Sequence, residues 1–324
     1  MARKKINLAV IFSGGKRGHK ANQKQFVYLK NNLSDFSLRK YNFDKNEQAK
    51  LLDDFIQGKV DVVLKNAYGR GHEAMAEVFL EQNRIPYFGS SANSTFIATS
   101  KFLAKQVFRQ SGLPVVDDAY VDNKLWAKDK KYIVDLIKKK IGFPCLIKDI
   151  GGTDSRGIYK VDSLSRLEKS LNKAIARHSG VIVEKFISQA YEAVCLAVGN
   201  DYPEIYTPLG INKASQKIFS VKMKNGVSMI NFDVPAKLSP RLTKQVKKIT
   251  KRAHQALNCR TFSRADIIIA KNKLYILEAD VHTGFSENSA ATVMARYQGE
   301  NINDLFLKFY RLIEKRQAGP KDGK

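Results

Sequence analysis

Apolar and polar positions alternate along the first third of the chain in the manner of an α/β domain. Short apolar runs at residues 5–12, 60–64 and 85–88 are typical of buried strands. Between them, residues 46–57 and 72–83 carry apolar positions at a spacing of three and four, which predicts amphipathic helices. Strands that alternate with helices favour a parallel, doubly wound sheet, and this is the fold class expected here.

The middle of the chain combines helices with strands that follow one another more closely. Helical spacing predicts helices at residues 101–111, 125–140 and 163–177. Apolar runs predict strands at residues 143–148, 157–161 and 181–186. Only a loop rich in Gly, Ser and Thr separates the first two strands, which predicts a hairpin within an α+β unit.

The last third repeats this mixture with longer elements. Strands are expected at residues 192–198, 264–270 and 273–279, and helices at residues 239–257 and 302–315. The patterns therefore divide the chain into three predicted domains, at residues 1–98, 99–187 and 188–324.

The composition fits this organisation. The 324 residues are 44% apolar, which suits a globular protein of two or three domains. No run of 18 apolar residues occurs, so no membrane span is expected, and the N-terminal apolar segment is too short for a signal peptide. The three cysteines lie far apart and favour neither a disulfide framework nor a zinc site, so the expected location is the cytoplasm.

The formal net charge of +25 would attract anions such as nucleotides, nucleic acid or an anionic membrane surface. The lysines are scattered along the chain, and the clusters at residues 128–131 and 138–140 share one predicted helix, so a solvated face explains them as well. No pattern of aromatic residues interleaved with basic ones indicates RNA binding, and nucleic acid is therefore not the expected partner.

Three carboxylates near the end of the chain form the strongest candidate site. Glu278 and Asp280 are two apart on one predicted strand, so both side chains point to the same face of the sheet. The tight connection at residues 271–273 pairs this strand with the one that carries Asp266. Three carboxylates on one face repel each other unless a cation lies among them, and Mg²⁺ prefers such oxygen ligands. The sequence therefore predicts a metal site, against the alternative of a solvated acidic edge.

Lys101 and Lys148 are the basic candidates. Lys148 ends an apolar strand and leads into the loop at residues 149–156, whose N–H and hydroxyl groups suit phosphate oxygens. A lysine in this place can reach phosphates as a point charge.

These segments, in this order, resemble the D-alanine–D-alanine ligase family of the ATP-grasp superfamily over nearly the whole chain. The matching motifs lie at residues 11–15, 68–71, 85–90, 100–101, 142–149, 153–157, 183–187, 259–266 and 278–280. The resemblance implies an N-terminal α/β domain followed by a two-part ATP-grasp fold, whose α+β subdomains grip ATP. The metal site would belong to the second of these subdomains.

The resemblance also implies an activity, which is ATP-dependent carboxylate–amine ligation through an acyl phosphate, as in peptidoglycan precursor synthesis. The implied cofactors are ATP and Mg²⁺, with Mn²⁺ as an alternative. Amino acids would be the substrates, and a homodimer is the implied assembly. Lys101 and Lys148 would hold the phosphates, and Asp266, Glu278 and Asp280 the metal.

Further residues take their roles from the resemblance alone. The adenine hinge would comprise Glu184, Lys185, Phe186 and Ile187, with Glu192 at the ribose. The implied catalytic groups are Arg264 and the Gly284 N–H, which would stabilise an oxyanion, and Ser155 in the phosphate-covering loop.

The substrate end departs from the family pattern. His19 stands where the family carries a Glu that engages the amino group of the first substrate, and Tyr68 stands where it carries a His. Ser289 occupies the place of a serine that binds the substrate carboxylate. His282 is placed to touch a phosphate or a substrate carboxylate, although hydrogen bonds to its neighbours would explain it equally. The alternative function is a nucleotide-binding protein of this fold without ligase turnover, which docks on an anionic partner.

Overall fold

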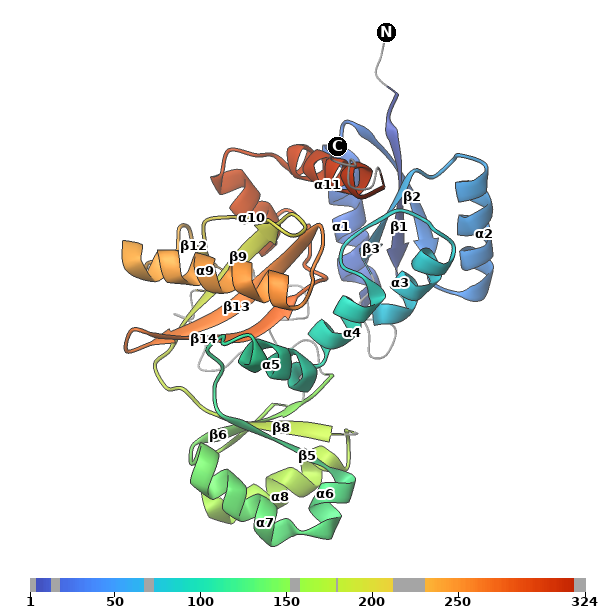
Figure 1. Ribbon diagram of the computed structural model, residues 1–324. Helices are drawn as coiled ribbons and strands as arrows, with labels where there is room; N and C mark the ends of the chain where they lie inside the picture. Colours follow the sequence, from blue (N-terminus) through green and yellow to red (C-terminus); the bar gives the residue numbers. More distant parts are fainter. Residues whose placement is uncertain are drawn as a thin grey trace, which may run out of the picture.

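The structure, a computed structural model, describes residues 4–12, 18–66, 73–151, 158–178, 180–211 and 231–317, without the side chains of residues 18–21, 66 and 73. Its strands form three sheets, which we call N-terminal, central and C-terminal (Figure 1). The strands of each sheet fall within one of the three predicted domains. The domain boundaries themselves stay a prediction.

The N-terminal sheet is parallel, as predicted, with the order β2-β1-β3-β4. Its strands are β1 (Ile6–Phe12), β2 (Phe36–Asn42), β3 (Val62–Asn66) and β4 (Tyr87–Phe88). Its helices are α1 (Gly18–Asn32), α2 (Lys45–Ile56), α3 (Glu73–Gln82) and α4 (Ala92–Thr99). Leu8, Ala9 and Val10 are fully buried, because β1 lies in the interior of the sheet and packs on both faces.

The central sheet is antiparallel, with the order β5-β8-β6-β7. Its strands are β5 (Asp118–Asp122), β6 (Cys145–Asp149), β7 (Tyr159–Val161) and β8 (Gly180–Lys185). The helices of this segment are α5 (Lys101–Gln110), α6 (Asn123–Lys128), α7 (Lys130–Leu136), a π-helical turn η1 (Ile137–Ile141) and α8 (Leu164–Ile175). Apolar side chains on one face, such as Ile147 and Val183, pack against α6, α7 and α8, which leaves the opposite face for the site.

The prediction of one continuous helix at residues 125–140 is wrong. Asp129 has φ −154° and ψ 83°, which ends α6, and its carboxylate accepts a hydrogen bond from the N–H of Tyr132 at the start of α7. An aspartate that caps the next helix favours such a break, because its carboxylate satisfies an N–H group that the first turn leaves unpaired.

The C-terminal sheet is antiparallel and follows the order β12-β11-β9-β13-β14, with β10 paired to β9. Its strands are β9 (Tyr191–Val198), β10 (Glu204–Ile205), β11 (Leu209–Ile211), β12 (Phe232–Asp233), β13 (Phe262–Ala270) and β14 (Lys273–Asp280). The helices that follow or accompany it are α9 (Pro240–Ala256), α10 (Ala290–Tyr297) and α11 (Ile302–Gln317). Ser239 caps α9, and Pro240 fills its first position.

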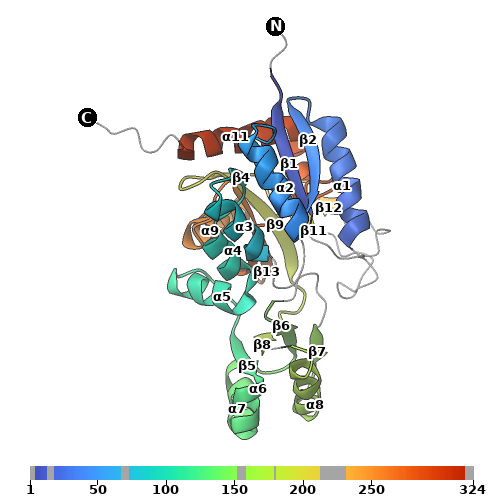
Figure 2. The same cartoon turned by 90° about the vertical axis from the view of Figure 1, so that its right-hand side faces the viewer.

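One hydrophobic cluster connects the N-terminal and C-terminal sheets. Leu8 and Val10 of β1 share it with Leu196 of β9, and Phe306 and Phe309 of α11 lie in the same cluster. Figures 1 and 2 both show α11 running from the C-terminal sheet across to the N-terminal one. The central sheet has a separate core, so it forms its own body beside the other two.

None of the helices in the described ranges combines the length and the apolar character that crossing a bilayer requires.

Candidate active site

The predicted carboxylates lie together on one face of the hairpin formed by β13 and β14. Asp266 is directly opposite Glu278 in the register, and Arg264 is opposite Asp280. Their neighbours Ala265 and Ala279 point to the other face and are buried in its hydrophobic cluster. The alternation of side chains along each strand therefore separates the apolar face from the charged one.

Arg264 lies between two of the carboxylates. Its guanidinium donates to both oxygens of Asp266, at 2.8 and 3.0 Å, and its Nη2 is 3.3 Å from Oδ2 of Asp280. Burial raises the pKa of Asp266; Arg264 opposes this effect, and the negative charge of Glu278 adds to it. The face thus holds more negative charge than its arginine compensates.

Lys101 brings a second cation to these carboxylates from α5. Its Nζ is 3.3 Å from Oε2 of Glu278, and its N–H donates to the carbonyl of Ile150 at the end of β6. Burial lowers the pKa of Lys101 and Glu278 raises it, with a net increase, while Lys101 holds the pKa of Glu278 below its ordinary value. Lys101 therefore connects the central sheet to the hairpin that carries the carboxylates.

Lys148 points from β6 to Glu184 on the neighbouring strand β8. Its Nζ is 2.6 Å from Oε2 of Glu184, whose Oε1 is 2.7 Å from Nζ of Lys105. Burial opposes ionisation of Glu184, but Lys148 and Lys105 outweigh it and lower its pKa to about 2. Glu184 is only 2% exposed, and its carboxylate is held between these two lysines, while its place in the adenine hinge stays a prediction.

Lys105 is a site residue that the sequence analysis missed. It is 1% exposed, and its Nζ also lies 3.6 Å from Asp118 of β5, which pairs with Arg109. The signal was present, because Lys105 shares the apolar stripe of α5 with Ala104 and Phe108. A lysine in such a stripe requires a buried anion.

The predicted hinge begins in the last two residues of β8, Glu184 and Lys185. The N–H groups of Lys185 and Phe186 already donate to the carbonyls of Asp117 and Pro144, at 3.0 and 3.1 Å. Ile187, half-buried, is the next residue along the hinge. Glu192 lies at the start of β9, opposite Ile268 of β13.

The loop after β14 places the substrate candidates. Gly284 precedes Phe285, whose N–H donates to the side-chain oxygen of Gln25 on α1 at 3.0 Å. Ser289 is the N-cap residue of α10, and its hydroxyl donates to the carbonyl of Ser286 at 2.8 Å. The loop is therefore anchored between the N-terminal and C-terminal sheets.

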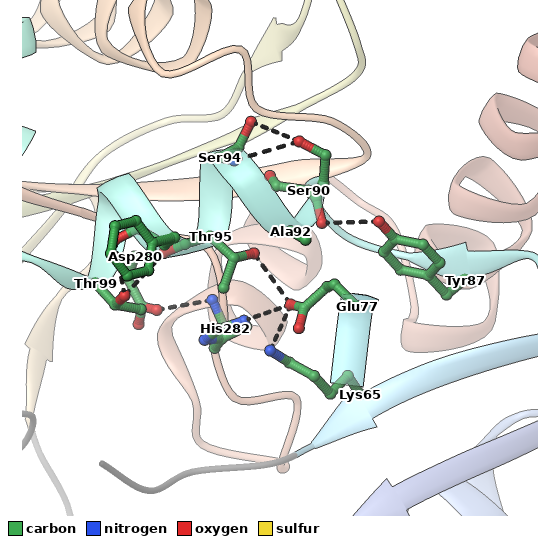
Figure 3. A network of polar contacts seen from close by, with 12 residues as sticks. Lys65, Glu77, Tyr87, Ser90, Ala92, Ser94, Thr95, Thr99, Asp280 and His282 are labelled. Carbon is green, nitrogen blue, oxygen red and sulfur yellow. Dashed lines mark hydrogen bonds and ion pairs between the residues drawn. The ribbon is translucent and has the colours of Figure 1, made fainter. Parts of the chain in front are cut away.

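His282 points toward the N-terminal domain. Its Nε2 lies 3.1 Å from Oε1 of Glu77, and its backbone N–H donates to Oδ1 of Asp280 at 2.8 Å (Figure 3). His282 thus contacts Glu77 and Asp280, and its contact with a phosphate or substrate carboxylate stays a prediction.

Three candidates cannot be placed. Ser155 and Tyr68 lie outside the described residues, and His19 lies in the first turn of α1 without a described side chain.

The carboxylates of Asp266, Glu278 and Asp280 are oxygen donors, which suit a hard cation such as Mg²⁺. Within the described ranges, no group of three or more His, Cys, Asp or Glu side chains is arranged to hold a metal ion. At the hairpin, Arg264 lies against Asp266 and Asp280, and Lys101 lies against Glu278. Carboxylate oxygens are the ligands that Mg²⁺ prefers, so the three side chains fit this metal by their chemistry, although cations of the protein accompany them in this arrangement.

Comparison with known proteins identifies relatives of one kind. The family model described as D-ala D-ala ligase C-terminus matches residues 107–311, which is more than half of the chain. The D-alanine--D-alanine ligase of Lactococcus lactis subsp. cremoris strain MG1363 is 28% identical over 247 residues, covering 75% of this chain and 69% of that protein. The enzyme of the same name from Syntrophobacter fumaroxidans is 27% identical over 258 residues, covering 79% and 80%.

Solved structures share the fold. The VanG D-Ala:D-Ser ligase from Enterococcus faecalis has a TM-score of 0.80 at 19% identity, covering 96% of this chain and 100% of that one. The D-alanine--D-alanine ligase from Bacillus anthracis complexed with ATP has a TM-score of 0.77 at 18% identity, covering 97% and 99%. The prediction of an N-terminal α/β domain followed by an ATP-grasp fold is confirmed. With more than half of its length matched by that family model, the chain belongs to the D-Ala–D-Ala ligase family.

Proposed function

We propose that this protein is an ATP-dependent carboxylate–amine ligase that forms a peptide bond between two amino acids through an acyl phosphate. The observation that carries the proposal is the hairpin face on which Asp266, Glu278 and Asp280 meet Lys101 and Arg264. The relatives named D-alanine--D-alanine ligase support D-alanine as the substrate at both positions. The expected place of such a product is peptidoglycan precursor synthesis.

ATP would bind between the central and C-terminal sheets. Lys148 and Lys101 would neutralise its phosphates as point charges, while Glu184 and Glu278 hold the two ammonium groups in place. The hinge of Glu184, Lys185, Phe186 and Ile187 would bind adenine. The N–H groups of Lys185 and Phe186 are occupied, so the N–H of Ile187 is the hinge donor that we assign to the base.

Asp266, Glu278 and Asp280 would hold Mg²⁺, or Mn²⁺ in its place. When bound there, the metal supplies positive charge that disperses the charge of the phosphates. The residues fit this role because their face carries one more negative than positive side chain, counting Asp266, Glu278 and Asp280 against Arg264 and Lys101.

The reaction would proceed in two steps. A carboxylate oxygen of the first amino acid attacks the γ-phosphorus of ATP, the bond to the β-phosphate oxygen breaks, and ADP leaves. The amine of the second amino acid then attacks the acyl carbon, the bond to the phosphate oxygen breaks, and phosphate and a proton leave. Arg264 and the N–H of Gly284 would stabilise the oxyanion of the tetrahedral intermediate.

The remaining candidates would complete the site. Ser289, at the N-terminus of α10, would bind a substrate carboxylate, since helix N-termini favour anions. His19 and Tyr68 would line the amino-group end, Ser155 the phosphate loop, and Glu192 the ribose.

Phosphate release from ATP, screened over D- and L-amino acids, tests the proposal. We expect release that depends on D-alanine in the wild type and falls at least about 100-fold in Glu278→Ala, because a proposed ligand of the metal that offsets the phosphate charge is lost. Glu168→Ala is the matched control, since this side chain is 61% exposed on α8 and its ion pair with Lys130 lies on the surface. Release that no amino acid stimulates would contradict the proposal.

The net charge of +25 favours a second candidate, a nucleotide-binding protein without turnover that docks on an anionic partner. Binding to a DNA duplex distinguishes the two. A docking protein should still bind the duplex at physiological salt, and the slope of log K against log salt should correspond to several phosphate contacts. A ligase with a solvated basic surface should lose this binding.

A further inference from the structure

A continuous chain of polar contacts joins the core of the N-terminal domain to the carboxylates of β14 (Figure 3). It begins with Lys65 on β3 and Glu77 on α3, which form an ion pair. The two side chains are only 2% and 3% exposed. A buried ion pair is costly to desolvate and needs further hydrogen bonds, so its surroundings are constrained.

Glu77 gathers donors from several parts of the chain. Its Oε1 accepts from Lys65 and from the hydroxyl of Thr95 on α4, at 3.0 Å for the latter. The third contact is Nε2 of His282, at 3.1 Å, from the loop after β14. Glu77 and His282 are 205 positions apart in the sequence, so this oxygen is a meeting point of two domains.

His282 also contacts Asp280 of β14. Its backbone N–H donates to Oδ1 of Asp280 at 2.8 Å, while Oδ2 of the same carboxylate is 3.3 Å from Arg264. Both oxygens of Asp280 are therefore fixed by partners, and one of these partners is held in place by Glu77.

We propose that Glu77 is a positioning residue for the metal site: it orients Asp280 through His282. The inference rests on the proposed function, in which Asp280 is a metal ligand. It gives the N-terminal domain, which contributes none of the proposed ligands, control over the affinity of the metal site.

The expected size of the effect follows from how such partners act. Groups that hydrogen-bond a ligating side chain hold it in the orientation that the metal needs, and their loss costs about 10–100-fold in metal affinity. Glu77 acts through one intervening residue, so the lower end of this range is expected.

Two variants break the chain at different points. His282→Phe keeps the ring size, the pair of Lys65 and Glu77, and the backbone N–H to Asp280, but loses the contact with Glu77. Glu77→Gln removes the charge itself. Glu77→Gln leaves the buried Lys65 with a neutral partner, so the stability of this variant is first measured by urea unfolding. If Glu77→Gln proves unstable, the test rests on His282→Phe alone.

Two further variants are the controls. His282→Gln restores a nitrogen donor near the position of Nε2 and should rescue the contact. Glu81→Gln makes the same change as Glu77→Gln on the next turn of α3, where Glu81 accepts from the hydroxyl of Tyr87 and the N–H of Ala92. Glu81→Gln tests whether loosening the contact of α3 with α4 is enough by itself to weaken metal binding.

The measurement is binding of Mn²⁺ complexed to a non-hydrolysable ATP analogue, followed by the relaxation rate of water protons. We expect the Kd to rise about tenfold in His282→Phe and Glu77→Gln and to stay within about twofold in the two controls. The analogue without metal, titrated calorimetrically in EDTA, should bind all five proteins alike, whereas general damage to the site would weaken it too.

The outcomes separate the two claims. If the wild type binds the analogue no better with Mn²⁺ than without it, the proposed metal site fails and the inference fails with it. If the wild type binds the Mn²⁺ complex more tightly and His282→Phe binds it equally well, only the inference is overturned.

Discussion

At the scale of single residues, Glu184 is a buried carboxylate that pairs with two lysines of the site. It is buried between Lys148, which is proposed to contact ATP, and Lys105, which never reaches the surface. The two lysines lower its pKa because a buried carboxylate beside two ammonium groups is far more stable ionised. Lys148 thus has its position fixed before a nucleotide arrives.

Replacing Glu184 by Gln should lower the free energy of unfolding at pH 7 by about 3–5 kcal/mol, because the buried Lys105 and the half-buried Lys148 lose a charged partner. The effect should depend on pH. The pKa is about 2 in the folded protein and 4.5 ordinarily, so the ionised group stabilises above pH 4.5, and this contribution disappears as pH falls from 4.5 through 2. Urea unfolding at several pH values should therefore show wild type and variant converging in acid. Glu168→Gln, on the surface, should change little at any pH.

At the scale of elements, the hairpin of β13 and β14 shows what could be predicted. Lys271 and Asn272 have φ values of 48° and 62°, the conformation of a two-residue type I′ turn, which fixes the register. The observed pairing of Asp266 with Glu278 needs one extra residue, Leu277, on β14, because that register alone would place Asp266 opposite Leu277. The bulge between Asp266 and Ile267 does not follow from it, because no Gly or other signal marks the position.

Other elements gave weaker signals. Helix α1 and strand β2 were not predicted: β2 is an edge strand whose only fully buried residues are Phe36 and Tyr41, so its pattern is incomplete. The break at Asp129 was missed because the apolar spacing of residues 125–140 also fits one continuous amphipathic helix, and the cap formed by Asp129 was not weighed against it. Tertiary packing rather than local periodicity decides such segments.

Gly210 of β11 makes a prediction at this scale. A Cβ at this position would lie 1.7 Å from the hydroxyl of Tyr191, which donates to Asp233 and accepts from the N–H of Lys237. Gly210→Ala should displace that hydroxyl and lower the free energy of unfolding by about 1–3 kcal/mol in urea titrations. Gly151→Ala is the control, since a Cβ there meets no atom of the described residues within 4 Å and should leave stability nearly unchanged. Equal stability of both variants would contradict the described packing.

At the scale of the whole molecule, the site lies where separate bodies meet. The carboxylates come from the C-terminal sheet, Lys148 from the central sheet, and the contact of Glu77 from the N-terminal domain. Residue types and order predicted the family and the first two groups. The contact of Glu77 with His282 could not be predicted, because neither position carries a local signal and their proximity depends on how the domains pack.

A ligand that binds between two bodies should stabilise the whole chain. Mg-ATP at about 100 times its Kd should raise the free energy of unfolding by about 2.7 kcal/mol, provided that only the folded protein binds it. Lys148→Met should lose most of this gain at the same concentration, because the phosphates lose a cation. Thermal unfolding with and without Mg-ATP measures both. A gain that persists undiminished in Lys148→Met would show that the nucleotide binds elsewhere.

The central claim is that a carboxylate of one substrate is phosphorylated before the amine attacks it. The most direct test follows the oxygen atoms of the substrate carboxylate. The enzyme is given ATP and D-alanine labelled with ¹⁸O in its carboxylate, and the released phosphate is examined by ³¹P NMR. The acyl-phosphate route predicts one ¹⁸O atom in each phosphate, formed in equal amount with the dipeptide. Phosphate without ¹⁸O, released while ATP is consumed, would mean that water attacks the nucleotide and would contradict the ligase mechanism.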